Sequence, residues 1–366
     1  MRHEYKPVSV GLGSALPTVE SQTSLSPWRS RDFARLALAP PAAALIYPFL
    51  LRLFHVLVTQ PQRGSLALSS LVLLSAIAVP AAGIYSYWKL NSVVSPSPMQ
   101  VRAKLLALFA VGTPPQYTAL GMLLTMAHNP VSDLVAWGVL WLGATALVLR
   151  PRSSDSSVVS VSMPAWHPRL RFTHGVSAAV IVLIFLAMHL TSHLSALWSV
   201  QAERILMNAF RHIYRAPVVE PILVALILFQ VSSGPVLAWH YVRRPIDSWR
   251  TLQVASGAYV FFYLLSHLDS VFIYARTFAK IQTDWNFATG APTGLLLDAW
   301  NIRLLPHYLL GVFFIMTHLV LGGRIILLAH GVDLRTTARL AVTGIALSAI
   351  LALAIMLGMV GIHVRS

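Results

Sequence analysis

Long apolar runs separated by short polar stretches recur along nearly the whole chain. A helix needs about 20 residues, at 1.5 Å of rise each, to cross roughly 30 Å of hydrocarbon. Nine runs are long enough or nearly so, at 37–58, 65–88, 105–127, 132–149, 172–194, 218–241, 251–275, 304–328 and 340–361. The pattern predicts an all-α integral membrane protein with about nine transmembrane helices.

The polar stretches divide these runs unequally. The longest of them between spans, Arg150 to Arg171, is rich in serine and separates four predicted spans from five. We therefore expect a four-helix membrane half at 36–150, a polar loop at 151–171 and a five-helix membrane half at 172–366. Residues 1–35 lack an apolar core followed by a cleavage site, so they are expected to form a disordered tail, although their Arg and Ser content leaves a mitochondrial presequence open.

Two short similarities connect the halves. "VPAAGIYSYWKL" in the second predicted span is similar to "QVSSGPVLAWHYV" in the sixth, and "GVLWLGAT" is similar to "GVFFIMTH", with Thr145 in the place of His318. A tandem duplication whose first copy lost its histidines would produce both, so the first half is interpreted as a possible degenerate repeat. Chance similarity between apolar segments remains the alternative.

Composition agrees with a membrane protein and charge predicts its orientation. Hydrophobic residues make up 56% of the chain and charged ones 11%, and the mean hydropathy is +0.68. With the N-terminus inside, 18 of the 27 Lys and Arg lie on the inner side and 8 on the outer side, and Arg52 falls within the first predicted span. This positive-inside bias places the C-terminus outside.

The net charge of +15 is thus expected to face lipid headgroups and not nucleic acid. A bacterial cytoplasmic membrane is the expected location, with a mitochondrial membrane as the alternative.

Histidines are the unusual residues of the apolar runs. The chain has no cysteine, which excludes disulfides, iron–sulfur clusters and thiolate ligands within it. Ionisable side chains inside a span are costly and point to function. In the second half they are His189, His193, His240, His267 and His318.

Helical rise predicts which of these histidines can meet. His189 and His267 lie about 25 and 24 Å from the inner ends of their predicted spans, so they are level. His318 lies deeper, level with Gln230, and His240 lies about 12 Å below that level.

Two level neutral imidazoles on facing helices suit the axial positions of a non-covalent b-type haem. The alternative is that each histidine bonds to a helix backbone or to a Ser or Thr across the bundle. His189 and His193 also form an HxxxH pattern found in membrane di-iron oxygenases, but no HxxHH follows it.

Three segments resemble a known family. "RFTHGVSAAVIVLIFLAMHLTSHL", "LQVASGAYVFFYLLSHLDS" and "PHYLLGVFFIMTHLVLGGRIILLAHG" are similar to the single-chain, five-helix, two-haem cytochrome b subunit of succinate dehydrogenases and fumarate reductases, over about 169–361. The resemblance implies His189 and His267 as ligands of one haem and His318 as one ligand of the other. Gln230 occupies the position of that haem's second ligand, and His240 is a substitute only if its span shifts by several turns.

The same resemblance implies an electron-transfer role that needs partners. It suggests flavoprotein and iron–sulfur subunits beside this chain, a quinone nearby, and no catalysis by the chain alone. His174 matches a histidine at the inner end of the family's first helix and is expected to contact a haem propionate or to be interfacial. Arg324 is expected to bind a propionate or a quinone carbonyl, or to reach lipid phosphate.

A second resemblance leads to a different function. "RHIYRAPVVEPILVALILFQVSSGPVLAW" is similar to fungal mitochondrial outer-membrane proteins suspected of haem binding and to bacterial relatives. It implies a non-enzymatic membrane scaffold or lipid-homeostasis factor that retains the bundle.

Overall fold

Seven long apolar helices dominate the computed structural model, which describes residues 31–365 except 61, 63, 93–94, 158 and 160–163. They are α1 (Arg31–Thr59), α2 (Leu66–Leu90), α6 to α7 (His167–Ser195), α9 (Val219–Val242), α10 with its extension (Ser248–Ala279), η6 with α13 (Asn301–Ala329) and α14 (Leu334–Met359). The described ranges contain no strand. The prediction of an all-α membrane protein is confirmed.

The seven helices differ from the nine predicted spans at two places in the first half. The predicted span 105–127 is two helices, α3 (Pro98–Val111) and α4 (Thr113–Met126), which meet at Gly112. Proline at 114 and 115 supplies no backbone N–H and its ring clashes with a preceding carbonyl, which disfavours continuation of the helix through this point. The Thr113 hydroxyl and the Gln116 amide instead donate to the carbonyls of residues 110 and 109.

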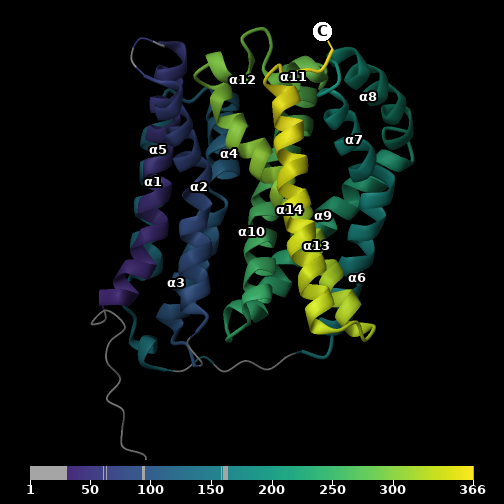
Figure 1. The fold of residues 1–366 in the computed structure, drawn as a ribbon. Coiled ribbons are helices and arrows are strands. Elements are labelled where there is room, and N and C mark those ends of the chain that lie inside the picture. The colour runs from purple at the N-terminus through teal and green to yellow at the C-terminus, as the bar shows by residue number, and fades with distance from the viewer. Residues whose placement is uncertain are drawn as a thin grey trace, which may run out of the picture.

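The other difference concerns the predicted span 132–149, whose helix is shorter than the seven long ones. Helix α5 (Asp133–Leu149) has 17 residues, and Ser132 caps its start by accepting from the N–H of residue 134. It packs against α1 and α3. In Figure 1, α3 and α4 lie at opposite ends of this side of the molecule, with α5 beside α1.

Two predicted boundaries need correction. Helix α1 begins at Arg31 in the described part of the chain, so residues 31–35 belong to it and not to a disordered tail; residues 1–30 lie outside the described residues. Helix α6 (His167–Ile181) begins with Pro168 in its first turn, where the missing N–H costs nothing, so residues 167–171 are helical and not loop.

Helix α10 (Ser248–Leu268) connects the two halves of the molecule. It packs against α2, α3, α4, α9 and α13, so it contacts both the first-half helices and the second-half helices. In Figure 1 the first-half helices lie on the left, α10, α13 and α14 in the centre, and α6 to α9 on the right. The described N-terminal end of α1 and the C-terminus lie at opposite ends of the bundle.

A buried ion pair also holds the halves together. Arg303, 5% exposed, donates to the carboxylate of Asp133 at 2.8 Å, and the Tyr117 hydroxyl donates to the same oxygen at 2.9 Å. The guanidinium lies 4.6 Å from the centre of the Tyr117 ring. Arg52, the charge inside the first predicted span, lies 3.6 Å from the other Asp133 oxygen. The first half therefore supplies the partner that lets Arg303 be buried.

Removing the charge of Arg303 should destabilise the protein. An Arg303→Gln variant leaves the Asp133 carboxylate without its closest cation, and breaking a buried pair costs about 3 kcal/mol. The free energy of unfolding, measured by chemical denaturation in detergent, should fall by about that amount. The exposed Arg335 provides the control, since Arg335→Gln should change stability by no more than about 0.5 kcal/mol. Equal losses in the two variants would contradict the role of the pair.

Candidate functional site

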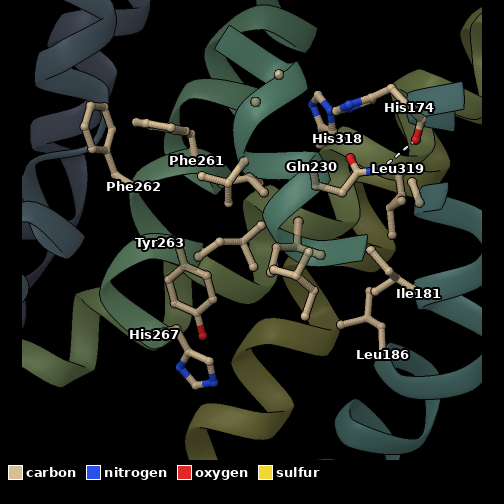
Figure 2. A pocket seen from close by; sticks show the side chains of 18 of the residues that line it. His174, Ile181, Leu186, Gln230, Phe261, Phe262, Tyr263, His267, His318 and Leu319 are labelled. Atoms are coloured by element: carbon tan, nitrogen blue, oxygen red, sulfur yellow. Dashed lines mark hydrogen bonds between the residues drawn. The ribbon is translucent and has the colours of Figure 1, made fainter. Parts of the chain in front are cut away.

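A large, mostly apolar cavity separates α6, α7 and α9 from α10 and α13. Its volume is about 1440 Å³, above the range of about 300–1000 Å³ that is usual for a drug-sized ligand. Residues from all five helices line it, and Figure 2 shows that several of the predicted site residues point into it. These lining residues are His174, His189, Gln230, His267 and His318.

His189 and His267 face one another at one end of this cavity. Helix α7 (Ala187–Ser195) carries the first and α10 carries the second, and their ring centroids lie 6.2 Å apart with the ring planes at 66°. Two imidazoles bound to opposite sides of one metal lie roughly 6 Å apart when each metal–nitrogen bond is about 2 Å. The predicted pair is therefore brought together at a spacing that suits axial ligation.

A π-helical turn adjoins each of these two histidines. Residues Val182–Leu186 form one such turn just before α7, and Asp269–Ala279 form a longer one just after α10. A π turn holds an extra residue, so it rotates the side chains that follow relative to a regular α-helix, and such turns are frequent at functional sites. The turn at 182–186 thus sets the direction in which His189 leaves its helix.

Aromatic neighbours fix both rings. Phe185 stacks on His189 with ring centroids 4.9 Å apart, and Tyr263 stacks on His267 at 5.5 Å and 14°. Each stacked contact limits rotation of the imidazole and shields one of its faces. The pair is therefore preorganised toward the cavity.

The opposite end of the cavity holds His174 and His318. They belong to α6 and α13, and the two imidazoles are close enough to interact electrostatically. Figure 2 shows both rings directed to the same end of the cavity, away from His267. The structure thus brings His318 together with His174, whereas the sequence suggested Gln230 or His240 opposite it.

Two predicted site residues do not reach the cavity. The Nδ1 atom of His240 bonds to the carbonyl of residue 236, and its ring packs against Trp166 and His167 at 5.5 and 5.0 Å. Arg324 lies with its guanidinium 4.7 Å from the Trp249 ring. Neither residue lines the cavity, because the position of a residue along a span gives its depth but not the side of the helix from which it projects.

Arginines stand at both ends of the apolar lining. Arg211, Arg215 and Arg276 line the end near His189 and His267, and Arg171 and Arg250 line the other. At the first end Arg215 donates to the Thr283 hydroxyl, and Arg276 forms an ion pair with Glu220. The cavity is therefore apolar along its length and carries cationic side chains at both ends.

Sequence reasoning missed a buried carboxyl beside this site. Glu203, on the short helix α8 (Val200–Tyr214), is 0% exposed, and neither of its oxygens has a hydrogen-bond partner among the described residues. Its Oε1 atom lies 3.7 Å from Nδ1 of His193, whose ring contacts that of His189 at 4.6 Å. Spacing offered a signal, because Glu203 shares one face of α8 with the buried Met207 and Tyr214.

His307 was also missed. It is 1% exposed in the first turn of α13, and its ring lies 4.7 Å from that of Tyr263. The segments 285–289 and 294–303 lie over this end of the bundle.

The stability of the protein should depend on the charge of Glu203. Burial raises the pKa of its carboxyl from 4.5 to about 7, against the opposing effect of Arg211 and Arg204. Folding therefore takes up a proton, so this contribution to stability is complete below about pH 4.5 and is lost as the pH rises through about 7. The wild-type Tm should fall between about pH 5 and pH 8, and less so in Glu203→Gln. The exposed Asp32→Asn control should follow the wild type; the same slope in all three proteins would refute this assignment.

Comparison with known proteins identified no relative: no family model, curated protein or solved structure matches the chain.

Proposed function

We propose that this chain is an integral membrane haem b protein that carries electrons, with His189 and His267 as axial ligands. The observation that carries the proposal is the facing of these two imidazoles, 6.2 Å apart, across one end of a large apolar cavity. Packing of two histidines alone would account for the ring contact. Such packing would not account for the large cavity beside the two rings.

The chemistry of the lining supports haem over a smaller ligand. Apolar side chains from α6, α9, α10 and α13 suit the faces of a porphyrin, and Arg211, Arg215 and Arg276 suit its carboxylates. Gly175, Gly322 and Gly323 line the cavity, and a Cβ atom added to any of them would meet no atom within 4 Å. At these three positions the cavity wall therefore leaves space for a flat, rigid molecule.

The residues of the chain would set the properties of this centre. A bound haem b supplies one-electron redox chemistry. His189 and His267 would hold the iron as neutral imidazoles, and the stacked rings of Phe185 and Tyr263 would limit their rotation. With both histidines bound, the iron would have no free coordination position for oxygen, which favours electron transfer over oxygen chemistry.

The proposal includes nine crossings, with the N-terminus inside. Helices α3 and α4 would cross as one span interrupted at Gly112, and α5 would cross with 17 residues, about 25 Å of helix. The arginine bias of the loops supports the orientation. A quinone in the bilayer and a flavoprotein with an iron–sulfur protein are the redox partners that fit such a chain.

Haem content and ligand variants test the proposal. The purified protein should show the α band of a b-type cytochrome in its reduced-minus-oxidised spectrum. His189→Ala and His267→Ala should each lower the haem content by one equivalent per chain, because one axial bond is lost. The exposed His212→Ala on α8 should retain the wild-type content.

Two results would contradict the proposal. One is a wild-type protein without an α band after haem supplementation during expression, as expected for a membrane scaffold or lipid-homeostasis factor. The other is an unchanged haem content in both ligand variants.

A further inference from the structure

We infer that the end of the cavity where α6 begins binds one anionic phospholipid, with the lipid phosphate on arginine side chains and the acyl chains in the apolar cavity. This end lies opposite the His189–His267 pair, and in the proposed orientation it lies at the inner membrane surface. The site does not depend on the haem, because a different set of charges and aromatic contacts builds it.

Three guanidinium groups from three segments of the chain converge at this end. Arg171 of α6 and Arg250 of α10 line the cavity, and Arg244 directly follows α9. Arg250 is close enough to the other two arginines to interact with them electrostatically. Among the described residues none of the three forms an ion pair with a carboxylate.

One acidic side chain belongs to this arginine cluster. The Oδ1 atom of Asp247 accepts the backbone N–H of Arg250 at 3.0 Å and thereby caps α10, and its charge also acts on the Arg250 guanidinium. A single carboxylate leaves the three arginines with a net positive charge. Like charges held together repel each other, so an anion that binds here stabilises the cluster.

Phosphate is the anion that suits this cluster best. A guanidinium group donates two parallel hydrogen bonds to a phosphate, and basic pockets between membrane helices bind the phosphates of lipid headgroups. A zwitterionic headgroup would bring a further cation close to the arginines. The net positive charge therefore favours an anionic phospholipid over a zwitterionic one.

An aromatic ring holds two of the arginines in place. The guanidinium carbons of Arg244 and Arg250 each lie 4.8 Å from the centre of the Tyr241 ring, which is buried and lines the cavity. A cation–π contact orients a guanidinium group without using its N–H groups. One N–H of Arg250 is donated to the side-chain oxygen of Gln253, and most of the others remain available for an anion.

His167 supplies a further polar atom at this place. It is 2% exposed, its ring packs against that of Tyr241 at 6.0 Å, and it interacts electrostatically with all three arginines. Its Nε2 atom has no hydrogen-bond partner among the described residues. A buried polar atom without a partner is costly, and a phosphate oxygen beside the arginines would be a suitable acceptor for an N–H at this position.

The cavity reaches the lipid-facing surface close to the cluster. Phe172 of α6 lines the cavity and is 71% exposed, and Ile326 of α13 lines it from the other side and is 56% exposed. Trp239, which also lines the cavity and is exposed, is the kind of residue that lies at the level of the headgroups. A lipid can therefore enter sideways from the bilayer while its headgroup stays at the membrane surface.

The lipid and the proposed haem lie at different depths. Arg250 precedes His267 by 17 residues of α10, which corresponds to roughly 25 Å. The acyl chains of one leaflet reach about 15 Å, which is half of the hydrocarbon thickness. They would therefore end about 10 Å short of the level of His267. A cavity of about 1440 Å³, larger than is usual for one ligand, has room for both molecules.

Lipid binding to the full-length protein tests the site. The purified, delipidated protein is titrated in detergent with dioleoyl phosphatidylglycerol or dioleoyl phosphatidylcholine, and bound lipid is counted by native mass spectrometry. One phosphatidylglycerol should bind about tenfold more tightly than phosphatidylcholine. Arg171→Gln and Arg250→Gln should each weaken phosphatidylglycerol binding about fivefold. The control Arg335→Gln removes an exposed charge at the start of α14, outside the cavity lining, and should bind like the wild type.

An uncharged substitution tests the apolar part of the site. Ala179 of α6 is exposed and lines the cavity, so Ala179→Phe should obstruct the acyl chains and weaken phosphatidylglycerol binding without disturbing the core. Ala346→Phe makes the same change on an exposed position of α14 outside the cavity lining and should have no effect. Inorganic phosphate has no acyl chain, so it should not displace the bound lipid.

Three results would overturn the site. They are equal affinity for the two lipids, displacement of the lipid by inorganic phosphate, and equal weakening by the Arg335 and Arg250 variants. The haem spectrum of the same samples separates this site from the proposed function. A protein without haem that still binds phosphatidylglycerol selectively would refute the haem and support the lipid site, and a haem protein without lipid selectivity would do the reverse.

Discussion

The membrane interior forces every polar group of this chain to find its partner inside the protein, and most of the architecture follows from that constraint. Arg303 is buried only because Asp133 and Tyr117, from the first half, receive its charge. The carbonyls freed at the break of Gly112 are satisfied by side chains from the following helix. Glu203 is one of several buried groups in the described residues whose side-chain atoms lack a hydrogen-bond partner, and it lies next to the candidate site.

The histidines obey the same constraint in two ways. The Nδ1 atoms of His174 and His318 hydrogen-bond to a serine hydroxyl, and that of His318 also to a backbone carbonyl, so their Nε2 atoms keep a lone pair. His189 and His267 are instead held by aromatic stacking. A hydrogen bond from Nδ1 fixes the tautomer of an imidazole and leaves Nε2 with a lone pair, whereas aromatic stacking limits rotation of the ring without selecting the tautomer.

Much of the fold was accessible from the sequence because apolar length and loop charge are strong signals in membrane proteins. A rise of 1.5 Å per residue predicted that His189 and His267 lie at the same depth in the membrane, and the structure brings the two rings together. The side of the helix from which a residue projects could not be predicted from the sequence. One π turn before His189 changes this direction without any change in composition. The sequence placed Gln230 or His240 opposite His318, whereas in the structure His174 of α6 lies at the same end of the cavity as His318, and His240 lies outside the cavity lining.

The cavity lies between two groups of helices in the second half, which also contact each other directly where α9 packs on α10. Helices α6 and α9 pack on each other on one side of it, while α10 and α13 form the other side and belong to the central body. A ligand that fills this space contacts both layers, so its binding energy adds to the cohesion of the fold. Occupancy of the cavity should therefore stabilise the α6–α9 layer against the central body.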